Sequence, residues 1–500
     1  MRSISHRQIM TSCAKASLLG LALVSLASCS SGDSSTGTPT SSGSAALQGP
    51  MVFVNNTGDK SLTSVALRGD SGNAVVGTIP AAEFENVALG DTQFSQGEWL
   101  FVNLAAANKV ATIDPLTGAT PVHETNLVTG TRPVHIYRDP TNGEVIWSMN
   151  DGDNAAGTTT PGEDLINCEN PARPGGAVFG SSVSILHNSH LGPGANPPTV
   201  EKTVCVLAAG HHVTAFSSGA GVPKRAFVSS ETSGEIAVID NDPASPTKWT
   251  MTHRIDLCNP LKEVTCDDES GTSLTIPFTP NNAHPHGIRW SKLTQKVYSI
   301  QEGYGQIVEI DPTSLVITNT FDLTSLPYSA FGISPNGRFL LLRGDTTPAT
   351  GTKLGVIDLS LMPPVRTDFT IAALDGTSPG AFKFSPDGNR FYILAGNTAT
   401  ATKKDRLFAF DASALTAATP SLTPLREIVL VATGGHSFDI LAQGAGAASF
   451  LAVSNSTDNS LSIINTTDNL IKQTVSVGLT PGAVQIYYPG AAAAGNQASS

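Results

Sequence analysis

The stretch Ala381-Phe-Lys-Phe-Ser-Pro-Asp-Gly-Asn-Arg-Phe391-Tyr-Ile-Leu decides the fold of this chain. Two apolar runs alternate with a period of two, which is typical of strands that bury one face. Ser-Pro-Asp-Gly between them supplies turn residues, so the stretch predicts two antiparallel strands. A third run, Arg406-Leu-Phe-Ala-Phe-Asp411, and a fourth that starts at Arg426 complete a four-strand unit.

This unit recurs along the chain. First strands are predicted near residues 87–89, 135–137, 213–216, 287–290, 331–334, 381–384, 437–441 and 483–487. The matching second strands are predicted near residues 52–55, 100–103, 145–149, 226–229, 296–300, 339–343, 391–394 and 450–454. The repeat length of about 55 residues suits four-stranded propeller blades with loop insertions.

The pattern predicts an all-β fold, a single β-propeller of eight four-stranded blades. Seven blades is the alternative, because the first three units are irregular. The body begins with a second strand at Met51 and ends with a first strand that starts at Ala483. The two ends are therefore expected to share one blade and close the ring.

Composition excludes several classes of protein. Gly 47, Pro 32 and only 14% charged residues among 500 argue against a helical bundle or coiled coil. The net charge of −12 becomes −15 without the first 28 residues, which hold Arg2, Arg7 and Lys15 and no acid. No basic face for nucleic acid is visible, and net attraction to anionic lipid is not expected. The protein is expected to be a monomer.

Residues 1–28 have the parts of an export signal: a basic start, a short apolar stretch and a cleavage region. The end of this region, Leu26-Ala-Ser-Cys29, resembles the lipobox of bacterial lipoproteins. The resemblance implies acylation of Cys29, a membrane anchor and an address in the cell envelope, most simply the outer membrane. An ordinary signal peptide with an unrelated cysteine is the alternative. Residues 29–48 are predicted to be a Ser/Gly/Thr tether, 49–489 the propeller and 490–500 a disordered tail.

Two blades carry a more specific likeness. Phe227-Val-Ser-Ser with Glu235-Ile-Ala-Val-Ile-Asp240, and Leu451-Ala-Val-Ser-Asn with Leu461-Ser-Ile-Ile-Asn, resemble the YVTN type of β-propeller repeat. That superfamily includes surface-layer proteins, lactonases and the propeller domains of nitrous oxide reductases and haem-containing nitrite reductases. The likeness implies the architecture and does not choose among these functions.

Histidines gather at one repeat position. The segments Gly210-His-His-Val213, His284-Pro-His-Gly287 and Gly435-His-Ser437 all lie just before an innermost strand, and His135 lies within one residue of that position. We call the propeller face with the second-to-third loops and fourth-to-first connections the crossover face. His135, His212, His286 and His436 should ring the channel mouth there, with His211 and His284 nearby. Imidazoles from several blades can bind copper, iron or zinc, and the alternative is a set of structural histidines.

Four cysteines remain after Cys13 is removed and Cys29 is acylated. An even number in an exported protein favours disulfides, with Cys258–Cys266 and Cys168–Cys205 as the expected pairs. A metal–thiolate site is the alternative. All four are expected near loops of the crossover face, where a protein or glycan partner could bind.

Three functions follow from these features. The first is an envelope lipoprotein that acts as a binding module and holds a transition metal at the histidines. The second is a copper- or iron-dependent oxidoreductase at the same residues. The third is a metal-dependent lactonase-type hydrolase, which needs carboxylates as well as histidines, and no acid aligns with the start of an innermost strand in the predicted register.

Overall fold

The computed structural model describes residues 49–95, 99–115, 123–128, 131–152, 180–187, 198–208, 211–266, 270–272, 279–323, 328–344, 353–374, 377–397, 404–416, 422–431, 437–441 and 449–487. The chain divides into two units, and Ala46–Ser500 is the unit that contains these residues. Among them no helix is long and apolar enough to cross a membrane.

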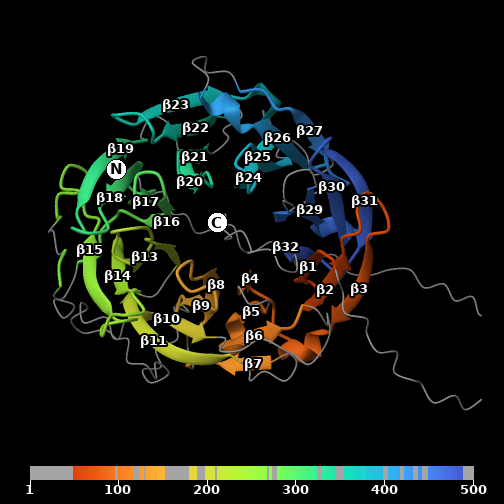
Figure 1. Ribbon diagram of the computed structural model, residues 1–500, viewed down its shortest axis with the longest axis horizontal. Coiled ribbons are helices and arrows are strands. Elements are labelled where there is room, and N and C mark those ends of the chain that lie inside the picture. Colours follow the sequence, from red (N-terminus) through yellow and green to blue (C-terminus); the bar gives the residue numbers. More distant parts are fainter. Residues whose placement is uncertain are drawn as a thin grey trace, which may run out of the picture. The chain divides into compact units, whose positions relative to one another are not determined.

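The described strands form eight four-stranded antiparallel sheets that follow one another around a ring (Figure 1). The eight-bladed propeller is thus confirmed. In the first four sheets the strands, from innermost to outermost, are β32 (Pro481–Tyr487), β1 (Met51–Asn56), β2 (Ser61–Ala66), β3 (Ala74–Ile79); β4 (Thr92–Phe94), β5 (Leu100–Leu104), β6 (Lys109–Ile113), β7 (His123–Asn126); β8 (Pro133–Arg138), β9 (Val145–Asn150), β10 (Gly180–His187), β11 (Thr199–Ala208); β12 (His212–Phe216), β13 (Arg225–Ser230), β14 (Glu235–Asp240) and β15 (Met251–Asp256).

The remaining four sheets continue the ring. Their strands are β16 (Pro285–Ser291), β17 (Lys296–Gln301), β18 (Gln306–Ile310), β19 (Ile317–Asp322); β20 (Tyr328–Ile333), β21 (Phe339–Gly344), β22 (Lys353–Asp358), β23 (Val365–Thr370); β24 (Thr377–Phe384), β25 (Arg390–Asn397), β26 (Arg406–Asp411), β27 (Arg426–Val429); β28 (Phe438–Leu441), β29 (Phe450–Asn455), β30 (Ser460–Asn465) and β31 (Leu470–Ser476). Short 3-10 turns occupy Ala81–Phe84, Ala105–Ala107, Ala372–Leu374, Ala412–Thr416 and Ser456–Asp458.

The ring closes as predicted, because β1 pairs antiparallel with β32 in one sheet. Met51 pairs with Tyr487 at the end of β32, whereas Asn56 pairs with Pro481 at its start. Innermost strands start at the crossover face, so the chain enters the propeller at the other face. We call that other face, with the first-to-second and third-to-fourth turns, the turn face.

One predicted strand is misplaced. The innermost strand of the β4–β7 blade is Thr92–Phe94, not residues 87–89. Leu89 is buried against a core cluster that includes Phe84 and Phe94, so its apolar character reflects packing of the connecting segment. The prediction of a strand at residues 87–89 was wrong because an apolar residue of a connecting segment can be buried without pairing in a sheet.

The blades pack on one another through apolar side chains. Trp147, Phe227 and Val238 belong to the largest cluster, which joins the β8–β11, β12–β15 and β16–β19 blades. Alternating strand residues point to opposite faces of each sheet, so each blade buries both faces against its neighbours. This packing makes the ring a rigid support for the residues at its two faces.

Candidate metal-binding site

Histidines of three neighbouring blades meet at the crossover face. His135 lies in β8, His211 and His212 precede or begin β12, and His286 lies in β16. In β8 and β16 the pairing with the second strand shifts register at this point, between Pro133 and His135 and between Pro285 and Gly287. Bulges re-aim side chains, and proline lacks the N–H that a regular ladder would use. The shift in β16 leaves His286 out of the regular ladder, whereas His135 follows the skipped residue of β8 and pairs with Met149.

His135 is held by a carboxylate. Its Nδ1 lies 2.6 Å from Oδ2 of Asp91, and its Nε2 lies 3.1 Å from Nε2 of His211. Burial favours the neutral ring, but the hydrogen bond and charge of Asp91, with the charge of Asp151, raise the pKa of His135. A proton on each nitrogen of His135 would then be donated to Asp91 and His211.

The surroundings of His211 shift its pKa in the opposite direction from that of His135. Burial, and then the neighbouring His135, lower the pKa of His211 to about 4. Its Nδ1 lies 4.0 Å from Oδ2 of Asp151, and its ring centre is 5.0 Å from that of His286. His211 is therefore a neutral imidazole near pH 7, with its Nε2 directed at His135.

His286 also has a carboxylate near its Nδ1 atom. Its Nδ1 lies 3.1 Å from Oε1 of Glu302. Asp91, Asp151 and Glu302 thus stand on the Nδ1 side of His135, His211 and His286 respectively, and each ring keeps its Nε2 for another contact. Carboxylates that accept a hydrogen bond from Nδ1 orient metal-binding imidazoles. The 2.6 Å contact of Asp91 with His135 is such a hydrogen bond, whereas the 4.0 Å between Asp151 and His211 is too long for one.

Two of the other predicted histidines, His212 and His284, have different surroundings. His212 is 1% exposed, neither ring nitrogen has a hydrogen-bond partner among the described residues, and its Nδ1 is 3.9 Å from Oδ1 of Asp151. His284 is exposed. It contributes to the lowered pKa of Glu263, a residue of the Cys258–Cys266 loop. His436 lies outside the described residues.

The expectation that no acid aligns with the innermost strands is wrong. Asp91 directly precedes β4, and it was missed because that strand was placed too early. Asp151 and Glu302 each follow a second strand directly, and the amides of both pair with the segment before the innermost strand of the same blade, at Arg132 and His284. An acidic residue directly after a predicted second strand could therefore have indicated a carboxylate beside the histidines.

Imidazole nitrogens such as those of His135, His211 and His286 are suitable ligands for a transition metal. Two ligands on a tetrahedral ion, each at about 2.0–2.1 Å, stand roughly 3.3 Å apart, close to the separation of the His135 and His211 Nε2 atoms. Across the described parts of the chain no three ligand side chains are already arranged around one ion. Binding would therefore need the imidazole rings to rotate toward a common point.

The three cysteines among the described residues are disulfide-bonded. Cys258 and Cys266 are bonded, closing a loop with a sequence separation of 8. Cys205 in β11 is also disulfide-bonded, and Cys168, its predicted partner, lies outside the described residues. Glu263 fastens the first loop to the β16–β19 blade by accepting hydrogen bonds from Tyr304 and from the side chain and amide of Asn282.

Comparison with known proteins gives the fold. No protein-family model matches the chain, and no curated protein matches it significantly. AztD of Citrobacter koseri is similar in structure, with a TM-score of 0.54, 14% identity, and coverage of 88% of this chain and 98% of AztD. The dihydro-heme d1 dehydrogenase NirN in complex with DHE gives a TM-score of 0.52 at 13% identity, covering 87% of this chain and 74% of NirN.

A third similar structure is the periplasmic gluconolactonase PpgL of Pseudomonas aeruginosa. Its TM-score is 0.46 at 14% identity, with 88% of this chain and 100% of PpgL covered. Likeness at these identities shows the β-propeller fold alone. Function has to be argued from the residues of the site.

Proposed function

We propose that this protein is a membrane-anchored binding module of the cell envelope that holds a copper, iron or zinc ion at His135, His211 and His286. The observation that carries the proposal is the set of three imidazoles whose Nδ1 atoms face Asp91, Asp151 and Glu302. The carboxylates would orient the rings and leave the Nε2 atoms as ligands. Of the six histidines predicted for the metal site, this proposal uses His135, His211 and His286.

Protons and the ion compete for this site. His135 must give up a proton from Nε2 before that atom can bind a metal, and Asp91 raises its pKa. His211 has no such proton to lose near pH 7, because its pKa is about 4. We therefore expect the affinity for metal to rise with pH.

The test is the metal content of the chain from residue 47, purified without chelators or a histidine tag. We expect about one ion per chain after exposure to copper, iron or zinc, and loss of that ion when His135, His211 and His286 are changed to alanine. His123→Ala and His253→Ala are controls, because they change imidazoles outside the cluster. A folded protein that stays metal-free after exposure to all three ions would contradict the proposal.

The anchor has a separate test. Cells that express the full chain are labelled with a fatty acid, and we expect the label on the wild type and none on Cys29→Ala. A labelled Cys29→Ala, or an unlabelled wild type that is still exported, would contradict acylation at Cys29.

Metal-dependent hydrolysis is the second candidate, favoured by the carboxylates Asp91, Asp151 and Glu302 beside the histidines. When bound, the ion would supply Lewis acidity there. Lactone cleavage that depends on added zinc and on His211 would support it. Reversible reduction of bound copper or iron would instead support the oxidoreductase alternative.

A further inference from the structure

The exposed apolar side chains are unevenly divided between the two faces. Among the described residues 14 large apolar side chains are exposed, and ten of them lie in turns of the turn face or in the first residues of the fourth strands that start there. Only four lie toward the crossover face. Single exposed apolar residues are ordinary, but a concentration on one face marks an interaction surface.

Four of the ten lie in turns of two neighbouring blades, and they include Met362, the most exposed of the set. Met362 is 94% exposed and Leu361 44%, in the turn between β22 and β23. Leu293 is 50% exposed in the β16–β17 turn, and Val316 is 53% exposed in the β18–β19 turn. Four apolar tips therefore project from turns at the same end of the ring.

These turns are fixed to one another. Oγ of Ser291 donates to the carbonyl of Gly337 at 2.6 Å, which ties the β16–β17 turn to the β20–β21 turn. The amide of Leu359 donates to the carbonyl of Arg338 at 2.8 Å, which ties the β20–β21 turn to the turn that carries Met362. The tips are therefore held at fixed positions.

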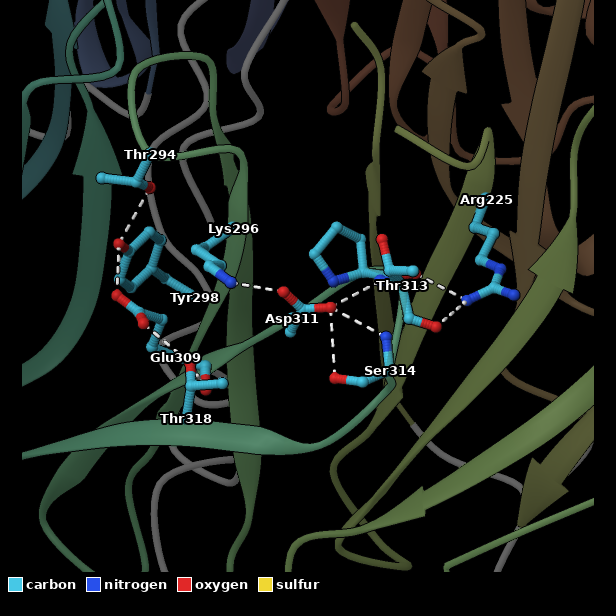
Figure 2. Close-up of polar contacts among 10 residues, drawn as sticks. Arg225, Thr294, Lys296, Tyr298, Glu309, Asp311, Thr313, Ser314 and Thr318 are labelled. Carbon is cyan, nitrogen blue, oxygen red and sulfur yellow. Dashed lines mark hydrogen bonds and ion pairs between the residues drawn. The ribbon is translucent and has the colours of Figure 1, made fainter. Parts of the chain in front are cut away.

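The β18–β19 turn is held in the same way (Figure 2). Asp311 accepts from Lys296 and from the amides of Thr313 and Ser314. Arg225 of the preceding blade donates to the carbonyl of Thr313 at 3.3 Å. Asp311 in this turn, and Asp358 beside the Met362 turn, are thus each engaged by a cation of the protein, Lys296 and Arg338 respectively.

Cations lie beside the apolar tips. Lys292 is exposed next to Leu293, and Lys224 and Lys248 lie in turns of the β12–β15 blade. Nζ of Lys248 lies 3.6 Å from the ring centre of Trp249, a pair of the kind found at membrane interfaces. Apolar tips with lysine and tryptophan beside them suit the headgroup region of a phospholipid bilayer.

The chain itself indicates what covers this face. Met51 begins β1 at the turn face, and the predicted tether of 20 residues, 29–48, joins it to Cys29. A tether of that length would reach about 25 Å, so an acylated Cys29 would hold this face near the bilayer at high effective concentration.

We infer that the turn face docks directly on the phospholipid surface, with Leu293, Val316, Leu361 and Met362 entering the headgroup region. The inference rests on the anchor of the proposed function and not on the metal site. The net charge of −15 that remains without residues 1–28 gives no long-range attraction to anionic lipid. Apolar contact therefore drives docking, and zwitterionic lipid suffices. Docking would present the histidine cluster to the side away from the membrane.

In the test, a lipid coupled to a cysteine at position 46 takes the place of the proposed acyl anchor at Cys29. All the described strands lie within residues 51–487, so the chain from residue 46 contains the eight sheets of the closed ring. Ala46→Cys is coupled to a maleimide lipid in phosphatidylcholine vesicles that contain brominated phosphatidylcholine. Met362→Trp reports on the turn face, and Val264→Trp, at a position that is 102% exposed on the crossover-face loop, is the matched control.

We expect brominated lipid to quench the tryptophan introduced at position 362 at least twice as strongly as the one at position 264. Leu293→Asp with Leu361→Asp should remove that difference while the chain stays coupled to the vesicle. Equal quenching of the two probes would overturn the inference. A dimer in solution that Met362→Asp dissociates would overturn it too, since the face would then belong to a second copy. Metal content measured on the same variants keeps this outcome separate from that of the metal site.

Discussion

The two halves of the ring use the same backbone position differently. In the blades from β4 to β19 the residues at or before the innermost strands include Asp91, His135, His211 and His286. In the half from β20 to β32 the first half of innermost strand β24 includes Gly380, whose carbonyl accepts a hydrogen bond of 2.9 Å from Arg343. Among the described residues, one half brings acidic and histidine side chains together at this position, and in the other half the Gly380 carbonyl joins two blades. The fold supplies equivalent positions, and the residues decide what each does.

The largest expected difference between the halves is in their tolerance of added volume. A Cβ at Gly303, beside the His286 segment, would lie 1.8 Å from the carbonyl oxygen of Asn282, whereas at Gly380 the nearest atom is 3.3 Å away. Gly303→Ala should lower the free energy of unfolding by at least about 3 kcal/mol and Gly380→Ala by less than about 1 kcal/mol. Urea denaturation of both variants measures this, and equal losses would contradict the difference in packing.

The second prediction concerns pH. The folded-state pKa of His211 is about 4, below its ordinary value of 6.5. Unfolding therefore takes up a proton, so its stabilisation is complete above pH 6.5 and is lost as the pH falls toward 4.

In metal-free protein this loss should be about 2–3 kcal/mol. His211→Gln should lose correspondingly less stability between these pH values, as measured by denaturation at each pH. An unchanged pH profile would show that His211 titrates normally. Asn455→Gln, in the other half, serves as the control that should keep the wild-type profile.

The third and smallest effect concerns the orienting carboxylates. Asp91→Asn should weaken metal binding by about 10- to 100-fold, because the amide no longer holds His135 with Nε2 free to act as a ligand. Asp439→Asn is the matched change in the other half, where Asp439 pairs with Lys383 at 3.2 Å. Its metal affinity should stay within about twofold of wild type, as measured by competition titration. If both changes weakened metal binding equally, the loss would come from a general disturbance of the fold and not from the contact of Asp91 with His135.

Much of the fold was predictable because each strand pair carries its own signal. Phe391 and its neighbours alternate in polarity beside a Ser-Pro-Asp-Gly turn, and both features are local. Val87 and Leu89 led to a wrongly placed strand, because a buried connecting segment and a short buried strand have the same pattern of apolar residues in the sequence.

The site was predictable only in part. Repeat alignment brought the histidines to one face, but His211 and His212 are neighbours in sequence that point to different surroundings. Only the register at the start of β12 leaves His211 partly exposed and His212 buried. Asp91, Asp151 and Glu302 come from other blades or other strands, and their approach to the rings depends on the closed ring.

The central claim is that three Nε2 atoms share one ion, and anomalous diffraction from crystals of the metal-loaded protein tests it most directly. The account predicts one anomalous peak at about 2.0–2.1 Å from Nε2 of His135, His211 and His286. A peak elsewhere, or none in crystals soaked with copper, iron and zinc, would contradict it.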